Sequence, residues 1–117
     1  MTKKNLATIR GNLRKTKNTI KRLGWVKHTM RDEATGAVCT LGAFETIGIW
    51  ENCGDPTLFI FQKAISRHLK KGNVPVDHWN DSRQRTLDQV YDMFDYAIEL
   101  AKEPSNFKKL EADTYEW

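Results

Sequence analysis

The first 24 residues show the clearest pattern of apolar and polar positions in the chain. Apolar or small side chains recur every three or four residues, and this spacing stacks them on one face of a helix. They are Leu6, Ile9, Leu13, Thr16, Ile20 and Leu23. Gly24 follows directly and can adopt the left-handed conformation that ends many helices. The pattern therefore predicts an amphipathic helix over residues 3–23.

The next segment lacks a helical period. Residues 25–39 contain two short apolar stretches on either side of a turn-like sequence that ends in Gly36, which predicts a short, irregular β-hairpin. From Thr40 the apolar positions Leu41, Phe44 and Ile47 return to helical spacing, and Cys53-Gly54 offers a stop. We therefore expect a second helix over residues 40–52.

Two further helices are predicted from their start signals. Asp55 can cap a helix that begins at Pro56, and this helix should run to residue 71 with Gly72 at its end. Residues 73–85 are predicted to form a loop. Thr86 and Gln89 have the spacing of a capping box, which predicts a last helix over residues 87–103. The fold class is thus mainly α: a compact four-helix domain over residues 1–103, with a β-hairpin between the first two helices and a C-terminal tail over 104–117.

Chain length, apolar runs and cysteine content exclude several classes of protein. The chain has 117 residues, enough for one domain, and no apolar run approaches the ~20 residues needed to cross a bilayer. No membrane partner is expected. Two cysteines without CxxC spacing suit reduced thiols and a cytoplasmic protein, in the host cytoplasm if it is phage-encoded.

A net charge of +4 conceals an uneven distribution. Residues 1–31 contain no acid and more than half of the 19 Lys and Arg residues, and most of the latter lie on the polar side of the first predicted helix. These are Lys3, Lys4, Arg10, Arg14, Lys15, Lys17, Lys21 and Arg22. Such a surface can neutralise the phosphates of DNA or RNA, or bind an acidic protein. The alternative is a solvated face that only keeps the protein soluble.

The last predicted helix has the opposite charge on its polar face. Its acids are Asp88, Asp92, Asp95, Glu99 and Glu103. We expect both charged faces to point outward, so that they cannot neutralise each other within one monomer. They would instead serve a partner protein or a homo-oligomer, unless this face too is simply solvated.

One combination of residues has the chemistry of a nucleophilic site. Cys39 could act as nucleophile, His78 as base and Asp81 as the group that orients the base, which would suit a hydrolase or a small-molecule binder. Nothing in the spacing brings them together, and cysteine is more often a small buried residue. Trp79, Asn80 and Asp81 are either a buried anchor for the predicted loop or part of a ligand site. His28, His68 and His78 lack metal-ligand spacing, and no cofactor motif is present, so neither a metal nor a cofactor is expected.

Several short motifs resemble those of a known family. They are Gly24-Trp25, Gly36 shortly before Cys39-Thr40-Leu41-Gly42-Ala43, Trp79-Asn80-Asp81, and Arg85-Thr86. The pattern resembles a family of small proteins of unknown function found in actinobacteria and their phages. The resemblance implies a compact intracellular domain and is compatible with a phage origin, but it implies no activity. Taken together, the sequence favours a non-enzymatic binding module, a phage regulatory or host-interaction protein, over an enzyme.

Overall fold

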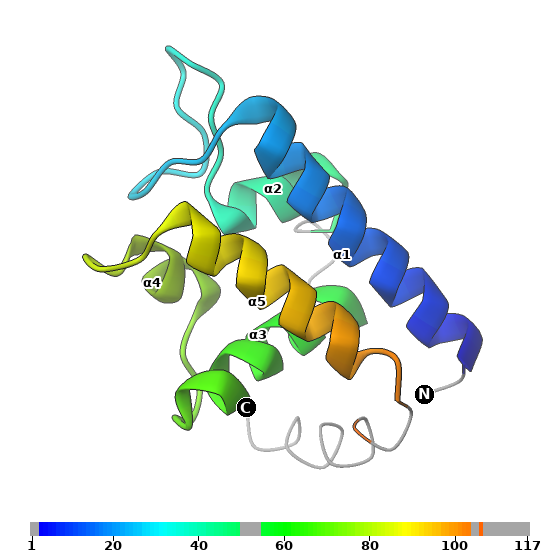
Figure 1. Ribbon diagram of the computed structural model, residues 1–117. Helices are drawn as coiled ribbons and strands as arrows, with labels where there is room; N and C mark the ends of the chain where they lie inside the picture. The colour runs from blue at the N-terminus through cyan, green and yellow to red at the C-terminus, as the bar shows by residue number, and fades with distance from the viewer. Residues whose placement is uncertain (1–2, 50–54, 104–105, 107–117) are drawn as a thin grey trace.

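The computed structural model describes residues 3–49, 55–103 and 106, and Figure 1 shows the arrangement of their five helices. These are α1 (Lys3–Leu23), α2 (Thr40–Thr46), α3 (Pro56–Leu69), α4 (Val76–Asp81) and α5 (Leu87–Leu100). The mainly α class is confirmed, whereas the predicted count of four helices is wrong. Part of the expected second helix, and the expected tail over 104–117 except Asn106, lie outside the described residues.

Two long helices, α1 and α5, lie side by side and run in opposite directions (Figure 1). Contacts between them pair Arg10 with Ala101 at one end and Lys17 with Asp95 nearer the other. Helix α3 packs against both of them. The buried face of α1 holds the residues that the helical period predicted, with Leu13 fully buried. Gly24 has a φ of +94° and ends α1 as expected.

The centre of the core is an aromatic cluster contributed by four helices. Phe61 of α3 lies between Phe94 of α5, at 4.5 Å between ring centroids, and Phe44 of α2, at 5.3 Å. Trp79 of α4 packs edge-on against Phe61 at 5.8 Å. Burial of such large rings is the main favourable term in folding.

The starts of α3 and α5 agree with the sequence signals, whereas α4 begins inside the predicted loop. The Asp55 side chain accepts a hydrogen bond from the Thr57 N–H at 2.7 Å, with Pro56 in the first turn. Thr86 and Gln89 form the predicted capping box. Both caps satisfy backbone donors that the first turn leaves without partners.

The helix ends differ from the predictions for a local reason. Helix α2 stops at Thr46 because Gly48, at φ +89°, closes the helix, with Gly48 N–H bonded to Glu45 and Ile49 N–H to Phe44. Helix α3 stops at Leu69 because Lys70 itself takes the left-handed conformation at φ +55°. Both are Schellman-type ends, and the second needs no glycine. Helix α5 likewise ends at Leu100, before the predicted limit at residue 103.

The predicted β-hairpin over residues 25–39 is wrong. The segment makes only two isolated bridges, and both use Val38, one with Trp25 and one with Arg31. The two stretches are joined by separate backbone hydrogen bonds, such as Val26 N–H to the Val38 carbonyl and Cys39 N–H to the Met30 carbonyl, and these do not form a regular ladder. Other backbone groups bond to side chains of α4: the Asn80 amide donates to the Val26 carbonyl, and Asp81 accepts from the His28 N–H. The pairing is thus interrupted where α4 supplies partners for the backbone.

Candidate functional site

The basic face of α1 is divided into two parts by its position beside α5. The Arg10 guanidinium donates to the Ala101 carbonyl at 2.7 Å, and the Lys17 ammonium lies 2.8 Å from Asp95. The Lys17 side chain is only 18% exposed. Arg10 and Lys17 therefore make contacts within the protein, which leaves them poorly placed to bind a partner.

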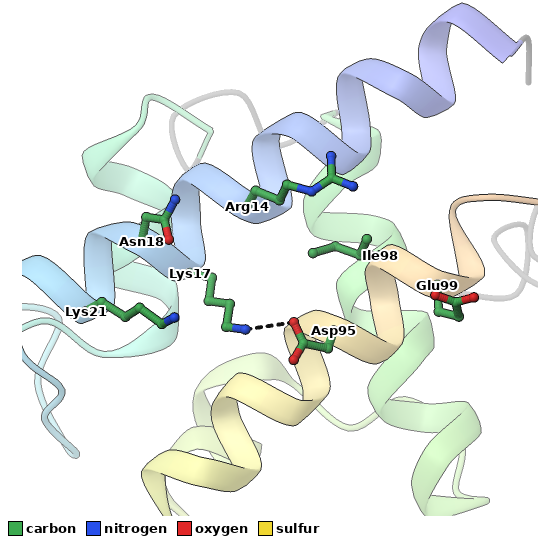
Figure 2. A pocket seen from close by; sticks show the side chains of 7 residues that line it. All are labelled: Arg14, Lys17, Asn18, Lys21, Asp95, Ile98 and Glu99. Carbon is green, nitrogen blue, oxygen red and sulfur yellow. Dashed lines mark hydrogen bonds and ion pairs between the residues drawn. The ribbon is translucent and has the colours of Figure 1, made fainter.

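A groove runs between the two helices beside these contacts (Figure 2). It has a volume of about 430 Å³, with Arg14, Lys17, Asn18 and Lys21 on the α1 wall and Asp95, Ile98 and Glu99 on the α5 wall. We call it the α1–α5 groove. Most charged side chains of both faces are exposed, as expected. The expectation that the two faces cannot meet within one monomer is wrong, because antiparallel packing sets their edges side by side and Lys17 pairs with Asp95.

The rest of the basic face is exposed. Arg14, Lys15, Lys21 and Arg22 all have exposed side chains, and we call these four residues the outer basic surface. Within the described residues, no ion pair is recorded for any of them, although the Lys21 ammonium lies 5.5 Å from the centre of the Tyr91 ring. Lys3 and Lys4 belong to α1, but their side chains are outside the described part of the structure.

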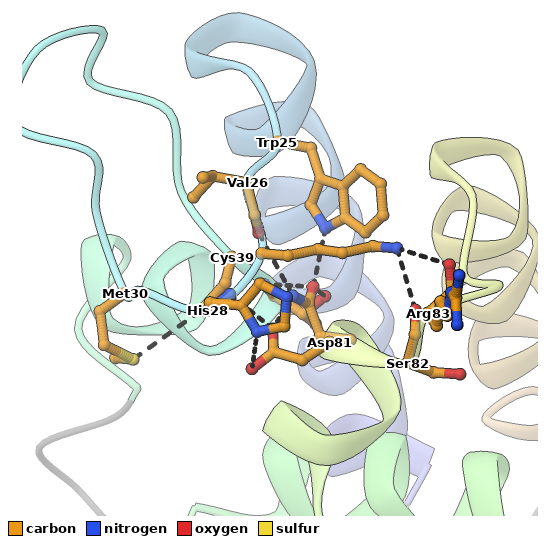
Figure 3. A network of polar contacts seen from close by, with 11 residues as sticks. Trp25, Val26, His28, Met30, Cys39, Asp81, Ser82 and Arg83 are labelled. Carbon is orange, nitrogen blue, oxygen red and sulfur yellow. Dashed lines mark hydrogen bonds and ion pairs between the residues drawn. The ribbon is translucent and has the colours of Figure 1, made fainter.

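The Trp79-Asn80-Asp81 motif lies on α4, not in the loop predicted for residues 73–85. Its central residue, Asn80, is fully buried. Asn80 Oδ1 accepts hydrogen bonds from the Trp25 indole N–H at 2.7 Å, the Thr40 N–H at 3.0 Å and the Thr40 hydroxyl at 2.6 Å. Figure 3 shows Trp25, Val26 and Asp81, which lie around these contacts. The amide group donates to Val26 and Asp81. This Asn80 network (Trp25, Val26, Thr40, Asn80 and Asp81) joins α4, the 25–39 segment and the start of α2.

Asp81 holds the 25–39 segment in an unusual conformation. Its Oδ1 accepts from the N–H of His28, which has a φ of +70°, at 2.9 Å. Burial alone would raise the pKa of Asp81, but the hydrogen bonds from His28 and Asn80 outweigh it and lower that pKa below its ordinary value. Asp81 is thus an ionised acceptor that stabilises a local turn.

Cys39 caps a helix through its side chain. Its sulfur accepts from the Gly42 N–H at 3.3 Å and so caps α2. The side chain is 4% exposed, and burial raises the pKa of the thiol. The described part of the chain shows no hydrogen bond from Cys39 to either His78 or Asp81, and His78 is exposed. A buried, protonated thiol that is not hydrogen-bonded to a base lacks the activation that a nucleophile needs, and the nearby Asp81 charge further disfavours the thiolate.

The motifs of the family pattern meet at these same contacts. Gly42 is required because a side chain at this position would run into the Met30 carbonyl. Arg85 lies over the Trp79 ring at 4.5 Å and donates to the Trp79 carbonyl, while Thr86 caps α5. The roles of Trp25 and Thr40 as partners of Asn80 were missed in the sequence, since no spacing along the chain signals a contact across 40 residues or more.

Within residues 3–49, 55–103 and 106, no three His, Cys, Asp or Glu side chains converge in a way that could hold a metal ion. No helix among them is long and apolar enough to cross a membrane. Cys39 is a free thiol, and Cys53 lies outside the described residues.

Comparison with known proteins gives a family but no function. A family model described as a family of unknown function, DUF6197, matches residues 4–100. Neither curated proteins nor solved structures gave a match. The predicted membership in a family of unknown function is confirmed, while the actinobacterial or phage source stays a prediction.

Proposed function

We propose that this chain, which belongs to DUF6197, a family of unknown function, binds the phosphate backbone of nucleic acid through α1. The observation that carries this proposal is the outer basic surface, where four exposed cations have no ion-pair partner in the described part of the chain. This role would place the protein in the cytoplasm, that of the host if a phage encodes it.

The spacing of the four cations suits a regular array of phosphates. Arg14 and Lys21 are seven residues apart, as are Lys15 and Arg22, which corresponds to about 10 Å along the helix axis. The two pairs lie on neighbouring faces of α1. Each phosphate that such a cation neutralises releases condensed counterions and so favours binding, most strongly at low salt.

The surroundings favour a phosphate backbone over an acidic protein. The neighbouring surface positions hold Ala7, Thr8, Gly11 and Asn18, with no large apolar side chain among them. Protein interfaces usually bury an apolar or aromatic centre. Among the described residues of α1 no aromatic side chain lies between the cations, and the ring next to Lys21, that of Tyr91 on α5, is half-buried, which disfavours a platform for stacking single-stranded bases.

The test compares two charge reversals of equal size. Lys15→Glu with Arg22→Glu alters the outer basic surface, whereas Arg67→Glu with Lys71→Glu alters exposed residues at the end of α3, far from α1 in Figure 1. Lys17 is left unchanged because it pairs with Asp95. Binding to mixed-sequence duplex DNA and RNA is measured by fluorescence anisotropy from ~50 mM salt upward.

We expect the wild type to bind with an affinity that falls steeply as salt rises. The α1 variant should bind at least about tenfold more weakly and lose about two from the slope of log affinity against log salt, while the α3 control keeps that slope. Absence of wild-type binding at ~50 mM salt, where electrostatic attraction is strongest, rejects the proposal. Equal losses of affinity in the two variants would mean that binding depends only on net charge and not on α1.

A second candidate function is self-association, and the α1–α5 groove favours it. A basic wall beside an acidic wall allows the α1 of one copy to face the α5 of another across a two-fold axis. Sedimentation velocity over a range of concentrations tests this. A wild-type protein that stays monomeric at the highest concentration excludes it, whereas dimers that dissociate in the Glu99→Lys variant support it.

A further inference from the structure

A second cavity lies on a different face of α5 from the α1–α5 groove and shares no lining residue with it. It has a volume of about 320 Å³ and lies between the end of α3, α4 and the first half of α5. Its walls include Leu69, Trp79, Arg85, Asp92, Met93 and Tyr96. A cavity of this size, with mixed apolar and polar walls, is in the range of small-molecule sites.

Arg85 is a fixed cation in this wall. Its Nε donates to the Trp79 carbonyl at 2.9 Å and its Nη1 donates to Gln89 Oε1 at 3.2 Å, while the guanidinium lies 4.5 Å from the centre of the Trp79 ring. Both hydrogen-bond acceptors are neutral. Among the described residues no carboxylate forms an ion pair with Arg85. Partial burial lowers its pKa, yet a guanidinium stays charged in proteins.

Trp79 gives a second and independent observation. The side chain is 1% exposed, and its indole N–H has no acceptor in the part of the chain that the structure describes. Buried donors are nearly always satisfied, so each exception calls for a reason. Trp79 lines the cavity, although its indole nitrogen is itself fully buried, so a ligand oxygen that supplies the acceptor needs a small shift of the side chains around it.

The remaining walls suit a flat apolar group. Tyr96, Met93 and Leu69 line the cavity, and the ring of His68 lies 5.7 Å from that of Tyr96. Aromatic rings and the methionine thioether both pack well against a planar ring.

We propose that this cavity binds a small aromatic carboxylate, with the carboxylate paired to Arg85 and the ring against Met93 and Tyr96. A carboxylate matches the planar fork of a guanidinium and accepts from an N–H, so it supplies what both Arg85 and Trp79 lack. Asp92 is the one acid among the lining residues. Its side chain is exposed, so solvent weakens its repulsion of an anion.

The binding test uses 2-naphthoate and its neutral analogue 2-naphthamide as probes. Both are titrated into ¹⁵N-labelled protein, and the indole N–H signal of Trp79 is assigned by its loss in Trp79→Phe. We expect 2-naphthoate to shift this signal and those of α5 saturably, with a dissociation constant of about 1 mM or lower. The amide should bind about tenfold more weakly, because it lacks the charge-assisted pair with Arg85.

Matched charge variants test whether Arg85 is the residue that binds the carboxylate. Arg85→Gln should weaken 2-naphthoate binding about tenfold. Arg83→Gln removes an equal charge two residues away, outside the cavity, and should leave binding within about twofold of the wild type. Asp92→Asn, at an exposed position, should tighten binding about twofold by removing the like charge. Circular dichroism checks that each variant is folded.

Three results would overturn the proposal: no saturable shift with 2-naphthoate at ~10 mM, equal binding of the amide, or equal loss in Arg85→Gln and Arg83→Gln. If Arg85→Gln does not fold, the acid–amide comparison and Asp92→Asn still decide. Since none of these changes lies on α1, the outcome does not depend on whether the protein binds nucleic acid.

Discussion

The Asn80 network and the α1–α5 groove both join distant parts of the chain through polar contacts, yet they differ in exposure to water. Asn80 is fully buried and binds Trp25 and Thr40, which lie 55 and 40 residues away. In the groove, Lys17 meets Asp95, whose side chain is 59% exposed. Similar polar contacts therefore contribute much or little to the stability of the fold, depending on whether water can replace a lost partner.

The magnitudes follow from that difference. A buried donor left without an acceptor costs about 1–3 kcal/mol, because no water compensates for it. An exposed ion pair contributes about 0–1 kcal/mol, because each charge is well solvated alone. The network should therefore govern stability, and the groove should be free to change with little effect on the fold.

The largest effect is expected for Asn80→Ala. The change leaves the Trp25 indole N–H and the Thr40 N–H and hydroxyl without their shared acceptor, so the free energy of unfolding should fall by about 3 kcal/mol or more. Urea denaturation measures this loss. Asn18→Ala, an exposed asparagine in the groove, is the control and should cost less than about 0.5 kcal/mol. Similar losses in both variants would break the comparison.

An intermediate effect, dependent on pH, is expected for Asp81→Asn. The folded pKa of Asp81 is lowered, so the stability it contributes is fully present above its unfolded pKa, ordinarily 3.8, and is lost as pH falls through the folded value. At pH 7 the variant should be less stable than the wild type by about 1 kcal/mol. At pH values below the folded pKa the difference should shrink.

Urea midpoints at neutral and acid pH measure this difference, with the exposed Glu33→Gln as control. A gap between wild type and Asp81→Asn that stays constant with pH would show that the ionised carboxylate contributes nothing to the turn at His28.

The smallest effect is expected at the groove. In a double-mutant cycle of Lys17→Met and Asp95→Asn, the coupling free energy should be about 0.5 kcal/mol and should decrease in high salt. A coupling above about 2 kcal/mol would mean that the contact is as well shielded from water as the network, and would erase the contrast between the two regions.

Local signals were read reliably from the sequence. The apolar period of α1, its stop at Gly24, the Asp55 cap with Pro56, and the Thr86–Gln89 capping box all depend on residues within one or two helical turns of each other. Helix ends were less predictable. Gly48 is a stop signal as strong as Cys53-Gly54 and closes α2 first, whereas nothing in the sequence favours Lys70 over Gly72 as the left-handed residue that ends α3.

The candidate site was predicted only in part. The sequence shows that the basic residues of α1 share one helical face. Which of them pair within the protein, as Lys17 does, and which stay exposed, as Lys15 does, depends on the helix that packs beside them. Trp79, Asn80 and Asp81 were recognised as an anchor or a ligand site. Asn80 and Asp81 prove to be bonded within the fold, while Trp79 also lines a cavity.

The helical class, the starts of α1, α2, α3 and α5 and the amphipathic faces follow from the sequence alone, because each depends on backbone and side-chain chemistry between near neighbours; the start of α4 at Val76 does not. Tertiary packing set how the backbone hydrogen bonds of residues 25–39 are divided between the segment itself and the side chains of α4, and it put α1 against the acidic edge of α5. It also placed Arg85 on Trp79 at the wall of a cavity. The physical reason is that a buried polar group takes the partner that packing brings within reach, and position along the chain does not specify that partner.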